Sequence, residues 1–214
     1  MEHFPILLSG LGVSVKFALV GFILGCVVGI PGGLITSFRI LILSQLTGLF
    51  FEIMRGVPTI VLAMLLYFGL QMDMFPSGVV AIFVISSGCI AERVHNSITS
   101  AALRTDETVK ITFSSAVAAI PKALPDLFAQ LARQSVETFK ETSVLMVIGV
   151  AELTSMGKQL YSRSLSIEGL LWAALLYLML SLIIRLFAKG MEVLFNFVLK
   201  KNTYPIHTND ETPA

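Results

Sequence analysis

The sequence predicts an all-α integral membrane protein with five transmembrane helices. Of the 214 residues, 55% are hydrophobic and only 14% are charged, and the mean hydropathy is +0.84. A soluble domain of this size cannot bury so much apolar surface, so the excess must face lipid. The apolar residues fall into long runs, and a long apolar run satisfies its backbone hydrogen bonds in lipid by forming a helix.

The five predicted helices form one transmembrane domain over residues 1–200, followed by a polar C-terminal tail over 201–214. A sizeable hydrophilic segment, about 104–121, separates the third helix from the fourth. The helices are predicted at about 6–35, 41–71, 78–103, 122–150 and 166–197.

The first run carries Lys16 as its only charge. No Lys or Arg precedes the run, and it is too long for a cleaved signal peptide, so it is predicted to span the membrane. Small residues recur at every fourth position and would let another helix approach closely. A frayed helix end at Pro31 and Gly32 is the alternative explanation. The predicted helix-packing stripe is Gly21, Gly25, Gly29 and Gly33.

The second stretch, from Arg39 to Leu70, is too long for one straight span of about 20 residues. Either its first part lies at the membrane interface or the helix breaks near Gly56 and Pro58, and the break is favoured. The third run begins at Val79 and continues to Ala91.

The fourth helix has a charged face. Arg133, Glu137, Lys140 and Glu141 fall within roughly 100° of one another at 3.6 residues per turn. A soluble amphipathic helix with salt bridges is one explanation. Charges that line a bundle interior or a water-filled path are the other, and the apolar remainder of the chain favours it.

The segment from Lys158 to Arg163 is predicted to be a loop, and the last helix follows it. The distribution of basic residues favours an outer N-terminus and a cytoplasmic C-terminus. In this orientation Lys158 and Arg163 lie outside. The inner side then holds Arg39, Arg93, Arg104, Lys110, Lys122, Lys189, Lys200 and Lys201.

Motifs for enzyme chemistry are absent from the sequence. Gly157-Lys158 is followed by Gln159 instead of the Ser or Thr of a phosphate-binding loop. No G-x-S-x-G, H-E-x-x-H or dinucleotide motif is present. Cys26 and Cys89 lie in apolar runs without metal-ligand spacing, and the net charge of +1 argues against nucleic-acid binding. We therefore expect no enzyme activity, no metal site and no cofactor in this chain.

Several motifs, in order along nearly the whole chain, resemble those of polar amino acid ABC transporter permeases, the histidine, glutamine, arginine and opine group of binding-protein-dependent importers. The family pattern E-x-x-R-G-T-P … Y-F-G is matched by Glu52 to Pro58 and by Tyr67-Phe68-Gly69. Its I-A-E is matched by Ile90-Ala91-Glu92. Its K-D-T-S-L … V-I-G-V-x-E-L-T is similar to the stretch from Lys140 to Thr154.

This resemblance implies a type I ABC importer permease fold in a bacterial inner membrane. It also implies a second permease subunit, as a homo- or heterodimer, together with cytoplasmic ATPases that bind the ATP and an extracytoplasmic solute-binding protein. The family's coupling pattern, E-A-A … G … P, corresponds to Glu107 through Pro121, which has neither those alanines nor the glycine. The expected coupling residues are Glu107, Thr108, Val109, Lys110 and Phe113.

The altered coupling segment leaves a second function open, a non-transporting membrane partner or regulatory subunit that kept the permease fold. A secondary transporter or channel ranks third, because five spans and no visible repeat disfavour an inverted-repeat carrier.

The charged face of the fourth helix is predicted to line the substrate path. A free amino acid carries an ammonium and a carboxylate, and each needs a partner when water is removed. Lys140 could bind the carboxylate, while Glu141 or Glu137 binds the ammonium. Alternatively, Lys140 and Glu141 pair with each other or with Arg133 and only hold the bundle together. The predicted path is completed by Thr142, Ser86 and Ser87.

Overall fold

The structure is a computed structural model, and it describes residues 4–38, 41–103 and 113–203. Every regular element in these ranges is a helix. In chain order they are α1 (Phe4–Ser37), α2 (Leu41–Gly56), α3 (Thr59–Met64), the π-helix η1 (Leu65–Gly69), α4 (Met74–Leu103), α5 (Phe113–Glu141), the 3-10 helix η2 (Thr142–Ile148), α6 (Leu153–Ser164) and α7 (Glu168–Thr203).

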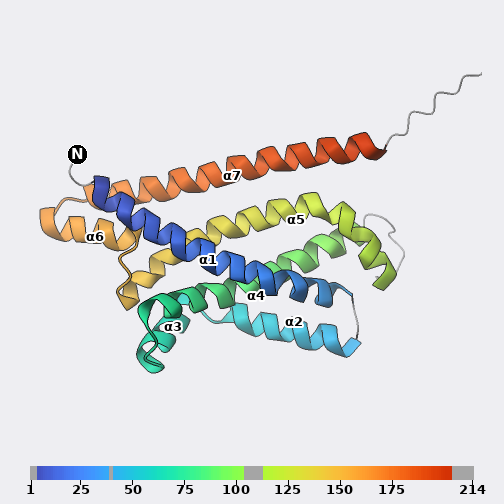
Figure 1. Cartoon of the computed structure of the whole chain (residues 1–214), viewed down its shortest axis with the longest axis horizontal. Coiled ribbons are helices and arrows are strands. Elements are labelled where there is room, and N and C mark those ends of the chain that lie inside the picture. The colour runs from blue at the N-terminus through green and yellow to red at the C-terminus, as the bar shows by residue number, and fades with distance from the viewer. Residues whose placement is uncertain (1–3, 39–40, 104–112, 204–214) are drawn as a thin grey trace, which may run out of the picture.

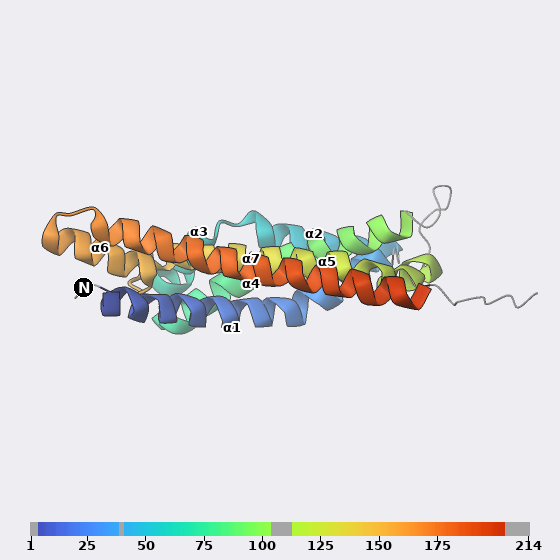
Figure 2. The ribbon, with the colours of Figure 1, turned by 90° about the horizontal axis from the view of Figure 1, so that it is seen from above.

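The helices form an elongated bundle along one axis (Figures 1 and 2). Helices α1, α4 and α7 run in one direction along this axis, whereas α2 and α5 run in the other. The short helix α6 lies at the end where α1 and α7 begin, and the end of α4 lies at the opposite end with the start of α5 (Figure 1).

Three described helices, α1, α4 and α7, are long and apolar enough to cross a membrane. The pair formed by α2 and by α3 with η1 would be a fourth span, bent by 82°. The predicted break is therefore confirmed. Pro58 lies at the break in an extended conformation. Proline interrupts a helix because it lacks the N–H that a continuing helix needs. Helix α5 is not among the apolar candidates, so the five-span count stays a prediction.

Helix α5 starts at Phe113, well before the predicted residue 122, and contains Pro121 and Pro125. Its N-terminal part bends away from the rest of the helix (Figure 1), as expected where prolines interrupt the hydrogen-bond ladder. The helix continues as η2, which ends at Gly149 with φ of 89°, a left-handed conformation that favours glycine.

The predicted loop from Lys158 to Arg163 is wrong, because these residues form the last turns of α6. Helix α6 starts at Leu153, because the side chain of Glu152 accepts hydrogen bonds from the free N–H groups of its first turn. The last predicted helix is α7, and it runs through Thr203, beyond the predicted end at 197.

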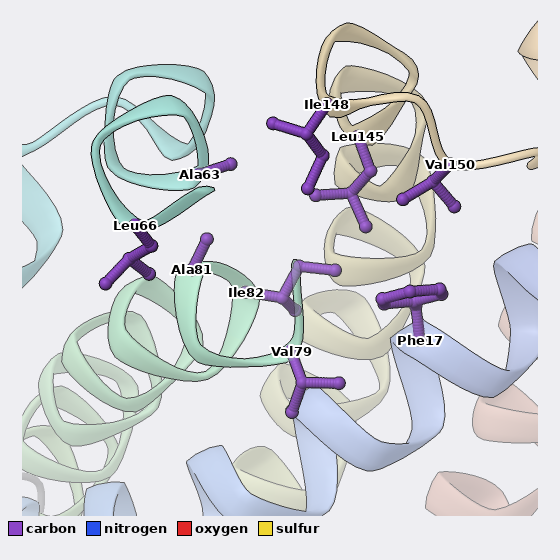
Figure 3. Packing of buried hydrophobic residues seen from close by; sticks show 9 residues of the cluster. All are labelled: Phe17, Ala63, Leu66, Val79, Ala81, Ile82, Leu145, Ile148 and Val150. Atoms are coloured by element: carbon purple, nitrogen blue, oxygen red, sulfur yellow. The ribbon is translucent and has the colours of Figure 1, made fainter. Parts of the chain in front are cut away.

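A buried apolar cluster joins the bent segment to the rest of the bundle (Figure 3). Ala63 and Leu66, from the segment after the bend, face α4 and η2 across this cluster. Phe17 brings α1 to the same place. The other members are Val79, Ala81, Ile82, Leu145, Ile148 and Val150.

The predicted glycine stripe of α1 lies buried against α4. A Cβ atom on Gly29 would stand 2.6 Å from the carbonyl oxygen of Ser87, and one on Gly33 would stand 2.5 Å from that of Ala91. At Gly21 and Gly25 the nearest atoms, at 2.5 and 2.9 Å, belong to side chains of α4. The two backbones therefore approach more closely than any larger residue would allow.

Candidate functional site

Charged side chains link α2, α4 and α5 in the half of the bundle where α4 ends. Glu92 of α4 forms an ion pair with Arg55 of α2, and Arg55 also lies 4.0 Å from Glu52. The Arg55 and Glu92 side chains are 32% and 45% exposed. Both helices are predominantly apolar, and charges on such helices are usually functional.

The next residue along α4, Arg93, faces α5 instead of α2. Its guanidinium donates to Glu137 at 2.5 Å, to Gln134 at 2.9 Å and to Gln130 at 3.1 Å, all on α5. Because consecutive helix positions are about 100° apart, Glu92 and Arg93 can serve two different helices. We call Glu52, Arg55, Glu92, Arg93 and Glu137 the charged belt.

A cavity of about 290 Å³ lies beside the belt, between α1, α2 and α4. Charged residues Glu52, Arg55 and Glu92 line it together with His95 and Asn96. Within the described residues, no group of three or more His, Cys, Asp or Glu side chains could hold a metal ion. The cavity is therefore suited to a small polar or charged solute.

Three of the predicted path residues are buried in helix contacts. Ser86 lies with its hydroxyl 3.0 Å from that of Thr138 on α5. Ser87 donates to the carbonyl of Val84, and Thr142 donates to its own helix at Phe139. The Ser86 hydroxyl therefore joins α4 to α5, the other two are satisfied locally, and all three residues are closed to solvent.

Lys140 and Glu141 point into different surroundings. Lys140 is exposed and lines a cavity of about 450 Å³ together with Tyr177 and Ser181 of α7. Glu141 is half-buried within hydrogen-bonding reach of Thr59 at the start of α3, and one of its carboxylate oxygens is buried without a partner. The structure thus separates the cation and the anion that the sequence pairs for substrate binding.

Glu141 shares its side of the bundle with part of the belt. Cys89, one turn before Arg93 on α4, lies within electrostatic reach of Glu92, Arg93, Glu137 and Glu141. One polar face therefore extends along α4 and α5 from the belt to Glu141. The sequence analysis selects Glu137 and Glu141 on this face as path residues but not Arg93, although a charge next to Glu92 at the end of an apolar run could have indicated it.

The coupling residues Glu107, Thr108, Val109 and Lys110 lie outside the described residues. Phe113 is the first residue of α5. The described residues on either side of them, the end of α4 and the start of α5, lie at the end of the bundle opposite α6 (Figure 1).

A second polar site lies at the start of α6, where the sequence analysis places Glu152 in the family motif but predicts no site. The fully buried carboxylate of Glu152 accepts from the N–H groups of Thr154 and Ser155 at 2.7 and 2.6 Å, and from the hydroxyl of Tyr177 at 2.9 Å. Ser14 of α1 accepts from the preceding N–H, that of Leu153, the first residue of α6. This cap joins α1, α6 and α7, but glutamate is not among the usual capping residues.

No family model matches the chain. Individual curated proteins do. The glutamine transport system permease protein of Escherichia coli strain K12 is 30% identical over an alignment that covers 89% of this chain and 94% of the relative.

The chain belongs to the amino acid ABC transporter permeases. A second relative of this kind is the arginine transport system permease protein of Bacillus subtilis strain 168. It is 25% identical over an alignment that covers 90% of this chain and 93% of the relative. The resemblance predicted from the sequence motifs is therefore confirmed. As a permease the chain is not an enzyme.

Solved structures have the same fold. A chain of an amino acid ABC transporter crystallised with histidines has a TM-score of 0.76 at 23% identity, covering 89% of this chain and 94% of that one. A chain of the inward-facing MetNI methionine ABC transporter has a TM-score of 0.71 at 18% identity, covering 89% and 96%. The curated permease relatives, rather than the shared fold, favour a transport role over a non-transporting partner.

Proposed function

We propose that this permease is the translocation subunit of an ATP-driven importer for a free amino acid, and that the polar face from the charged belt to Glu141 forms one wall of its path. The supporting observation is the carboxylate of Glu141, which has a buried oxygen without a partner among apolar helices. A carboxylate oxygen buried without a partner in a membrane protein is unfavourable unless a cation from the substrate or a partner meets it. The ammonium of an amino acid is such a cation.

Two cations could meet the substrate carboxylate. Lys140 is the partner predicted from the sequence, although it faces the cavity between α5, α6 and α7. Arg93 lies on the Glu141 side, where an incoming carboxylate could replace Glu137 on its guanidinium. Arginine binds carboxylates through two parallel N–H donors, so this exchange conserves the hydrogen bonds of Arg93.

We also propose the arrangement in the membrane and the partners. Five spans place the N-terminus outside and the C-terminus in the cytoplasm of a bacterial cell, following the distribution of Lys and Arg. ATPase subunits, which bind the ATP, would dock at the segment 104–121, where α4 and α5 are connected. The solute-binding protein would approach the α6 end, and a second permease subunit, identical or different, would supply the opposite wall.

The partner arrangement is tested by purifying the tagged chain from mildly solubilised membranes and identifying its companions by mass spectrometry. We expect an ATP-binding subunit and either one or two kinds of permease chain. Purification without any ATP-binding subunit would contradict ATP-driven transport.

The path is tested by uptake of labelled amino acids into vesicles that contain the assembled transporter. We expect Glu141→Gln to reduce uptake at least tenfold with normal assembly, because the amide cannot neutralise the ammonium. Lys140→Met and Arg93→Met show which cation binds the carboxylate. Lys16→Met, at an exposed position of α1 outside the proposed path, is the matched control and should leave uptake unchanged. Full uptake by the Glu141 variant would disprove the proposed path.

A further inference from the structure

A groove between α5 and α7, apart from the cavity beside the belt, holds a second group of charges. Its volume is about 380 Å³. Arg133 from α5 and Arg185 and Lys189 from α7 line it, together with the acids Glu137 and Glu192. Alanines at the helix contact leave the space open, and they are Ala129, Ala132 and Ala188.

The groove has an excess of free positive charge. Of its two acids, Glu137 is already bound by Arg93. Within the described part of the chain, Arg133, Arg185 and Lys189 form no ion pair or side-chain hydrogen bond. Three cations therefore face a single unengaged carboxylate, that of Glu192, and an anion bound here would gain more than a cation would.

The depth of these cations matches a lipid headgroup region. Arg185 and Lys189 follow Glu168, the first residue of α7, by about 26 and 32 Å at a rise of 1.5 Å per residue. The hydrocarbon core of a bilayer is about 30 Å thick. If α7 enters the membrane at its first turn, both cations reach the opposite interface, where phosphates lie.

The surroundings of the groove on α7 are apolar and open. Leu186 and Phe187 are each 69% exposed, and Leu182 and Ile183 are exposed as well. Only 11% of the most apolar part of α7 is buried inside the chain. A molecule with an anionic head at Arg185 could therefore lay its acyl chains along these side chains.

We propose that the α5–α7 groove is a binding site for an anionic phospholipid. The phosphate is held by the guanidinium groups of Arg133 and Arg185 and by the ammonium of Lys189, and the acyl chains pack on Leu186 and Phe187. Arginine suits this role because its fork of donors matches two phosphate oxygens. Basic pockets between transmembrane helices are known to bind such headgroups.

Native mass spectrometry of the full-length chain in detergent tests the site, with phosphatidylglycerol and phosphatidylcholine as probes. We expect the wild-type chain to retain phosphatidylglycerol in preference to phosphatidylcholine. Arg185→Gln with Lys189→Gln should weaken phosphatidylglycerol binding about 30-fold, from roughly a fivefold loss for each cation near the headgroups. The matched control removes one lysine and one arginine from exposed positions on α6, Lys158→Gln with Arg163→Gln, and should bind as the wild type does.

A second variant predicts the opposite change. Glu192→Gln removes the unengaged acid and should tighten phosphatidylglycerol binding about fivefold. Three results would overturn the proposal: unchanged retention in the Arg185 and Lys189 variant, equal retention of phosphatidylcholine, or displacement of the lipid by millimolar inorganic phosphate, which would indicate a free anion. Displacement by millimolar glutamine would also overturn it and assign the groove to the substrate path.

Discussion

Two helix contacts in this permease are built in opposite ways. Along α1 and α4, four glycines bring the backbones together and no charged side chain intervenes. Along α5 and α7, small and charged side chains line open cavities of about 380 and 450 Å³. Lipid is as apolar as leucine, so apolar side chains alone do not drive helices together. Close backbone approach stabilises the first pair, whereas the second pair leaves room for ligands.

Placing a larger side chain in the α1–α4 contact should have the largest effect on the free energy of unfolding. Gly29→Leu places side-chain atoms where the backbone of α4 already lies, and we expect a loss of about 3 kcal/mol in the free energy of unfolding. Unfolding in mixtures of mild detergent and dodecyl sulfate measures this loss. Gly12→Leu is the control on the same helix, because a Cβ there meets nothing within 4 Å. Equal stability of both variants would contradict the importance of close approach.

Removing the buried helix cap formed by Glu152 should have the second largest effect on the free energy of unfolding. Glu152→Ala leaves two backbone N–H groups and the hydroxyl of Tyr177 without their acceptor, at a cost of about 2 kcal/mol in unfolding free energy. Glu168→Ala, at an exposed helix start, should lose less than about 0.5 kcal/mol. A similar loss in both variants would show that the buried hydrogen bonds of Glu152 add no more to the unfolding free energy than an exposed helix start does.

The charged belt should contribute less, because water reaches it. Arg93→Met removes three hydrogen bonds to α5, but the Glu137 side chain is 53% exposed, so we expect a loss of about 1 kcal/mol. A double-mutant cycle with Glu137→Gln measures the coupling between the two charges. Additive losses would show that this ion pair contributes no stability of its own.

The smallest effect on stability is expected in the α5–α7 groove. Arg185→Gln with Lys189→Gln removes no ion pair within the described chain, so the unfolding free energy in lipid-free detergent should change by less than about 0.5 kcal/mol. A large loss there would mean that the cations hold α7 in place, and the contrast between the two helix contacts would disappear.

The sequence predicts features that depend on local spacing. A glycine at every fourth position indicates a packing face whatever its partner, and a proline interrupts a helix at a definite residue. Contacts between distant residues are harder to predict. Glu152 is recognisable as a cap only once Tyr177 and the start of α6 are beside it.

The substrate site shows the same limit. Lys140 and Glu141 are neighbours in the chain and suggest a pair that binds a zwitterion. The helix turns them toward different elements, Lys140 toward α7 and Glu141 toward α3. Ser86 appears available in the sequence, yet Thr138 closes over it. A helical position predicts the face of a helix, but only the neighbouring helices decide which faces are open.

The four-residue repeat of the glycines has a geometrical consequence. Four residues turn a helix by about 400°, so the stripe winds slowly around α1, and helices that meet along such a row cross at an angle. Beyond the crossing, visible in Figure 1, α1 and α4 must diverge and leave a wedge at each end. Met156 of α6 enters one wedge against Gly10, and Phe51 of α2 enters the other against Gly32. Helix α1 therefore connects α6, near its own first turns, with α2, near its own last turns.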